Sequence, residues 1–129
     1  MPHTEVHFFQ ERRGDVPVRN WLREVARTNA RAALRCVEAL GRLRQFGRDL
    51  RRPHADYLEQ GIYELRVRTG NVNYRILYFF HGRDVALLAN GFTKERKVPA
   101  GEIERAVARR LAYEADPDRH RHEQEPPDA

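Results

Sequence analysis

The stretch GIYELRVRTGNVNYRILYFF, residues 61–80, constrains the fold more than any other part of the chain. Its alternation of side chains on either side of the central TGN predicts two strands joined by a tight turn. Alternate residues of a strand share a face, so one side of the first strand should be core and the other charged. The core side comprises Tyr63, Leu65 and Val67, and the other side comprises Ile62, Glu64, Arg66 and Arg68.

The second strand of this hairpin carries Arg75 within an otherwise apolar run, YRILYFF. Apolar residues on both of its faces predict a central, mostly buried strand. A buried guanidinium needs an acceptor, which Glu64 on the neighbouring strand could supply as a cross-strand pair. Alternatively, Arg66 and Arg75 form a cluster on a helix-free sheet face, where their forked donors bind phosphate oxygens. Lys94, Arg96 and Lys97, just past the third strand, would add positive charge to that face.

Periodicity and turn residues predict the element order β-α-α-β-β-β-α. The expected strands are residues 5–9, 62–68, 73–80 and 84–89, with a linker over 51–61. A first helix is capped by Asp15 and has Pro17 in its first turn, and a second extends from near Asn29 to near Gly47. Pro99 opens a final helix.

This order predicts an α+β fold: a small antiparallel or mixed sheet with two N-terminal helices and a C-terminal helix. The helices should cover one sheet face and leave the other available. Residues 1–115 are expected to form a single domain, and residues 116–129, DPDRHRHEQEPPDA, an acidic, disordered tail.

The charge distribution favours a polyanionic partner. The chain has a formal net charge of +5, but from Glu114 onwards six acidic side chains face two basic ones. Residues 1–113 therefore carry +9, which suits RNA or DNA and would attract an acidic protein equally. No apolar run is long enough to span a membrane and no secretory signal is visible, so a soluble, cytoplasmic protein with no membrane partner is expected.

Several residues with functional chemistry have simpler interpretations. Cys36 lies on the apolar side of a predicted helix and is expected to be a small buried hydrophobe. The helical arginines are expected to form a solvated face. His120 and His122 lack further ligands at metal spacing, and we predict neither a metal nor another cofactor. His54 precedes the first hairpin strand and could reach the edge of the sheet.

The chain resembles the RelE/ParE superfamily of type II toxins, most closely its HigB-like, phage-derived branch. The matching segments, in the family's order, are VHFF…GDVPVRNWL, GIYELR with YRILYFF, and LLANGFTKERKVPAGEIERA. Together they span roughly residues 5–113, and the acidic tail lies outside them. The combination is fairly specific, although each fragment alone is weak.

The resemblance implies a RelE-like fold, ribosome-dependent mRNA endonuclease activity that inhibits translation, and neutralisation by a cognate antitoxin of the helix-turn-helix, HigA-like kind. Carried over residue by residue, it implies catalytic roles for Arg66, Arg75 and Lys94. Arg68, Arg96 and Lys97 are expected to contact RNA. Relatives usually have F-x-K-K-T-x-K-T-P where this chain has the shorter FTKERKVP, so the substitute for the second lysine is left open between Arg96 and Lys97.

An RNA 2′-hydroxyl can attack the adjacent phosphate without a metal, provided that charge is stabilised and protons are moved. Arg66 and Arg75 are assigned to the charge and Lys94 to proton transfer, with Glu64 and His54 as second-rank residues. Glu64 could act as a base or pair with an arginine. A ParE-like gyrase inhibitor and a non-catalytic module that binds antitoxin or RNA are the alternative functions.

Overall fold

The computed structural model describes residues 3–93 and 97–122. Its strands are β1 (Glu5–Phe9), β2 (Ala55–Glu59), β3 (Ile62–Thr69), β4 (Val72–His81), β5 (Val85–Thr93) and β6 (Arg121–His122). Its helices are α1 (Pro17–Thr28), α2 (Ala30–Phe46), α3 (Ala100–Ala115) and the short α4 (Pro117–His120), with a 3₁₀ turn at Gly47–Asp49. The predicted α+β class is confirmed.

The six strands form one mixed sheet in the order β2-β3-β4-β5-β1-β6. Strands β3 to β5 are an antiparallel meander, as the two predicted turns require, and β2 extends it by pairing antiparallel with β3. Strand β1 adds to β5 in parallel, and β6 adds to β1 antiparallel. The central position predicted for the strand carrying Arg75 is confirmed, since β4 has two strands on one side and three on the other.

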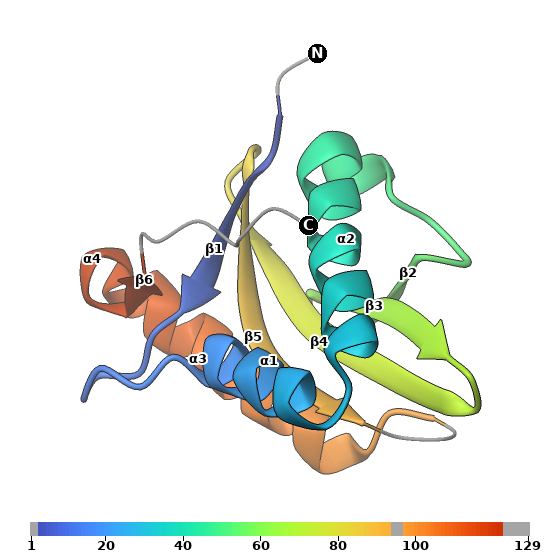
Figure 1. Ribbon diagram of the computed structural model, residues 1–129. Coiled ribbons are helices and arrows are strands. Elements are labelled where there is room, and N and C mark those ends of the chain that lie inside the picture. The colour runs from blue at the N-terminus through green and yellow to red at the C-terminus, as the bar shows by residue number, and fades with distance from the viewer. Residues whose placement is uncertain (1–2, 94–96, 123–129) are drawn as a thin grey trace.

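Helices cover both faces of the sheet (Figure 1). On one face, Leu65, Ile76 and Tyr78 form a core with α1 and α2. On the other face, the core beneath α3 contains Ile62, Leu77, Phe79, Ala106 and Tyr113. The expectation of one helix-free face is therefore wrong. The apolar residues of β3 and β4 that point away from α2 need a cover, and α3 provides it.

Two helix boundaries follow the sequence and one does not. Asn29 caps α2, because its side-chain oxygen accepts a hydrogen bond of 3.1 Å from the backbone N–H of Ala32. Gly47 ends α2 with a φ of 51°, in the left-handed region that favours glycine. Asp15 does not cap α1: the N-cap is Val16, with no side-chain bond, and the Asp15 carbonyl instead accepts a 2.7 Å bond from the Glu11 N–H.

Strand β2 lies within the predicted linker. Its residues pair antiparallel with β3, with Ala55 opposite Leu65 and Tyr57 opposite Tyr63. Ala55 is buried in the core beneath α2, and the rings of Tyr57 and Tyr63 meet edge to face at 5.0 Å. The prediction of an irregular segment over 51–61 is therefore wrong for residues 55–59, because β3 supplies the partner that this short segment needs.

The expected disorder from residue 116 onwards does not hold for residues 117–122. His120 stacks on Phe9, with ring centroids 5.2 Å apart, and its carbonyl accepts a hydrogen bond from the Gln10 N–H. Arg121 donates to the Tyr113 hydroxyl at 3.0 Å. The segment is ordered because it pairs with β1 and covers Phe9, which is 1% exposed. The remaining acidic residues, 123–129, lie outside the described residues.

A bulge interrupts the pairing of β4 with β5. Leu77 pairs with Asn90 and Tyr78 pairs with Leu88, which leaves Ala89 as the extra residue of β5. Ala89 packs in the core beneath α3, and the next residue, Asn90, donates to the Glu102 side chain of α3 at 2.8 Å. Gly91 consequently lies on the opposite face, directly against the Trp21 ring of α1.

In the part of the chain that the structure describes, no helix has the length and apolarity of a membrane span.

The contact between Gly91 and Trp21 leaves no room for a side chain. We expect Gly91→Ala to lower the free energy of unfolding by about 1–3 kcal/mol, because the new methyl group would displace the indole. Gly41→Ala in α2, where open space surrounds the new methyl group, should instead stabilise by about 0.5–1 kcal/mol. Urea denaturation measures both changes, and equal stabilities of the two variants would contradict this packing.

Cys36 is fully buried on the inner side of α2, as the sequence predicted. Burial raises the pKa of its thiol to about 12. Because only the thiolate reacts with disulfide reagents, we expect no labelling of the folded protein at pH 8 and complete labelling in urea. Rapid labelling in the absence of urea would show that this part of the core opens readily.

Candidate functional site

A buried ion pair joins β3 and β4 at the polar end of the sheet. Nη1 of Arg75 donates to both carboxylate oxygens of Glu64, at 2.9 and 3.1 Å. The side chains of Arg75 and Glu64 are only 11% and 4% exposed. The predicted cross-strand acceptor for Arg75 is therefore confirmed.

Arg66 belongs to the same cluster but reaches solvent. It lies directly opposite Arg75 in the β3–β4 register, and its Nε is 3.5 Å from the Glu64 carboxylate. Its side chain is 42% exposed, so a ligand in solution can reach it. One buried carboxylate thus holds two guanidinium groups side by side, with Arg66 as the accessible one.

Arg68 and Lys97 extend the positive surface around this cluster. Arg68 is exposed, and its Nε donates to the Gly70 carbonyl at 3.2 Å. Lys97 is also exposed and precedes α3. Lys94 and Arg96 lie outside the described residues, so their expected places in the site stay predictions.

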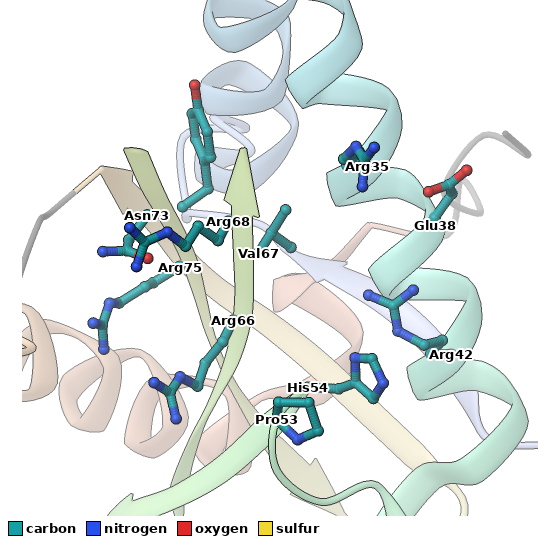
Figure 2. Close-up of a pocket in the computed structure, with 11 residues that line it drawn as sticks. Arg35, Glu38, Arg42, Pro53, His54, Arg66, Val67, Arg68, Asn73 and Arg75 are labelled. Carbon is teal, nitrogen blue, oxygen red and sulfur yellow. The ribbon is translucent and has the colours of Figure 1, made fainter. Parts of the chain in front are cut away.

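Two open pockets meet at the arginine cluster. The α2 pocket, of about 350 Å³, is lined by Arg35, Glu38, Arg42, Pro53, His54, Arg66, Val67, Arg68, Asn73, Tyr74 and Arg75. The α3 pocket, of about 670 Å³, is lined by Asp56, Tyr57, Leu58, Glu59, Glu64, Arg66, Arg68, Asn73, Arg75, Lys97, Val98 and Ile103. Figure 2 shows Arg66 and Arg75 on one side of β3, and Arg42 and His54 on the side that faces α2.

His54 lies beside the cluster through its backbone. Its carbonyl accepts a hydrogen bond of 2.9 Å from the Arg66 N–H, while its exposed ring lines the α2 pocket. Strand β2, which begins at the next residue, was not predicted. The exposed Tyr57 of this strand, which lines the α3 pocket, was not predicted as a site residue either. The alternation in ADYLE, just after Pro53, is the signal that could have revealed both.

Two acidic residues of the α3 pocket, Asp56 and Glu64, are paired with arginines. Arg52 donates to the Asp56 carboxylate at 2.7 and 3.0 Å and, with a smaller contribution from Arg66, lowers the pKa of that group below its ordinary value. Glu64 is held by Arg75, as described above. The exposed part of Arg66 and the exposed Arg68 keep positive charge that a ligand can reach.

The histidines of the H-x-H motif serve the fold. His120 and His122 each contact Gln10 through Nδ1, at 2.8 Å to its carbonyl and 3.2 Å to its side chain. Among residues 3–93 and 97–122, no group of three or more His, Cys, Asp or Glu side chains is arranged to hold a metal ion.

The mixed sheet and its helices are consistent with a RelE-like α+β fold. Residues 20–111 match the family of phage-derived Gp49-like proteins (DUF891), so the chain belongs to that family. The family is part of the RelE/HigB toxin-like group. The matched region contains β3, β4 and the whole arginine cluster. A comparison with curated proteins found no match.

Glu64 is expected to be essential for the stability of this end of the sheet. Glu64→Gln leaves the Arg75 charge buried without its counter-charge, and we expect a loss of about 3 kcal/mol in the free energy of unfolding. Glu59 is an exposed residue that lines the α3 pocket together with Glu64, and Glu59→Gln should cost less than about 0.5 kcal/mol. Urea denaturation of the two variants compares these costs, and a Glu64→Gln protein as stable as Glu59→Gln would refute the argument.

Proposed function

We propose that the protein is the toxin of a type II toxin–antitoxin system and acts as a ribosome-dependent mRNA endonuclease. The observation that carries the proposal is the arrangement of Arg66 and Arg75 on one buried carboxylate, at the meeting point of two open pockets. Membership of a toxin-like family supports it. A second support is the charge of +9 on residues 1–113, which suits a nucleic acid.

The proposed reaction is attack of the RNA 2′-hydroxyl on the adjacent phosphate, with departure of the 5′-oxygen. Negative charge develops on the phosphate oxygens, and fixed donors aimed at that charge lower the barrier. Arg66 is the proposed direct ligand, because its side chain is the more exposed. Arg75 is the second donor, oriented by the hydrogen bonds from its Nη1 to both carboxylate oxygens of Glu64.

Proton transfer is assigned to Lys94, which follows β5 in the sequence. A lysine among other cations has its ammonium form disfavoured, and this eases exchange of its proton near neutral pH. Arg68, Arg96 and Lys97 are proposed to hold the RNA backbone. Together these side chains supply the chemistry without a metal ion.

The two second-rank residues receive different roles. Glu64 is proposed as a positioning residue, since both of its oxygens accept hydrogen bonds from Arg75 and neither is directed to solvent. His54 remains a second candidate for proton transfer, because its exposed ring lies in the α2 pocket beside Arg66. Substitution of His54 by Gln separates its role from that of Lys94.

A cognate antitoxin, proposed to be a helix-turn-helix protein of the HigA-like kind, would neutralise the activity. Family membership supports an antitoxin partner in general terms. The ribosome and mRNA as partners imply that the protein acts in the cytoplasm.

The test is to add the protein to a translating extract and to map mRNA 5′ ends with and without ribosomes. We expect new ribosome-dependent ends, reduced about a hundredfold by Arg66→Gln, because removal of one donor to a developing anion costs roughly 3 kcal/mol. Arg83→Gln, an exposed change in the turn between β4 and β5, should cleave like the native protein.

Native protein that blocks growth but produces no new mRNA ends would overturn the nuclease proposal. A DNA supercoiling assay then tests a ParE-like action on gyrase. Loss of both activities, with antitoxin binding retained, would identify a non-catalytic module.

A further inference from the structure

The α2 pocket contains cations that the proposed reaction does not use. Arg35 and Arg42 project from α2, and Arg42 points toward β3 (Figure 2). Nε of Arg42 is buried and has no hydrogen-bond partner among the described residues. A buried donor without a partner is costly. Arg42 also lines the pocket, so an anion there can pair with the charge of its guanidinium group.

The charge of the α2 pocket is strongly unbalanced. Arg35 and Arg42 line it on the helix side, and Glu38 is the acidic residue among its described lining residues. On the strand side the pocket reaches Arg66 and Arg68. Such a surplus of guanidinium groups in a hollow favours phosphate, which accepts two parallel hydrogen bonds from each fork.

The end of β2 opens a path between the two pockets. Pairing of β2 with β3 begins at Ala55 and Leu65, and the last backbone bond at this edge joins the Arg66 N–H to the His54 carbonyl. Beyond Arg66, β3 is the outer strand of the sheet. Arg66 and Arg68 consequently line both pockets, and an extended ligand can pass from one to the other across this edge.

From this geometry we infer that the α2 pocket is a second phosphate subsite, in which Arg42 and Arg35 bind a phosphate next to the one held by Arg66. This inference rests on the proposed function for its substrate, a single RNA strand. RNA is favoured over an acidic peptide because the two pockets are continuous at Arg66, and a nucleic acid presents a phosphate at every nucleotide. Arg42 and Arg35 thereby set the direction in which the strand crosses β3.

The test measures binding of labelled hexauridylate and of the dinucleotide UpU, which has a single phosphate, by fluorescence anisotropy at several salt concentrations. Arg42→Gln should weaken hexauridylate binding about tenfold and lower the slope of log K against log salt by about 0.7–1. Its affinity for UpU should be unchanged. Arg66→Gln should weaken both ligands, and Arg83→Gln should weaken neither.

Arg42→Lys keeps the charge, so it should retain the native salt slope, and thermal melting shows whether each variant is folded. Equal hexauridylate affinities of Arg42→Gln and Arg83→Gln would overturn the subsite, as would native protein that binds no hexauridylate. A hexa-aspartate peptide that binds as tightly and depends equally on Arg42 would overturn the assignment to RNA. Because binding is measured without ribosomes or cleavage, failure of the subsite and failure of the nuclease proposal give separate results.

Discussion

Burial of β4 on both faces is the constraint on which the rest of the structure depends. From Ile76 to Phe79 this strand is at most 1% exposed, so apolar cover is required above and below the sheet. Helices α1 and α2 supply it on one face and α3 on the other. Toward Asn73 and Arg75 the strand becomes polar. The arginine cluster lies there because the apolar cover ends there, and the pockets open at the same place.

The sequence allowed the faces of β3 and β4 to be assigned, because the period of two is local to each strand. It also offered Glu64 as one of two explanations for Arg75, since residues on neighbouring strands of a tight hairpin are constrained by the turn. It could not show which sheet face α3 would cover. The amphipathicity of a helix defines its own buried side, but the loop before α3 permits either face.

Strand β2 and the segment 117–122 were missed for a related reason. Each is short, and each is stabilised by a partner outside the segment itself: β3 for Ala55 and Phe9 for His120. Composition alone favoured a linker and a disordered tail. The meeting of the α2 arginines with the strand arginines is likewise a product of tertiary structure, and periodicity could only place Arg35 and Arg42 on a polar helix face. The expected roles of Lys94 and Arg96 remain predictions.

The bulge at Ala89 has a consequence for how this strand tolerates change. Before it, odd-numbered residues of β5 face α3; after it, even-numbered ones do, so that Phe92 joins the core beneath α3 while Gly91 meets Trp21. Loss of Ala89 would leave Leu88 opposite Tyr78 and Asn90 opposite Leu77, so the ladder would become regular while Gly91 and Phe92 kept their present faces. Elsewhere in β5 the loss of one residue would turn the neighbouring side chains over to the wrong face of the sheet, but at Ala89 the strand can be shortened by one residue without that inversion.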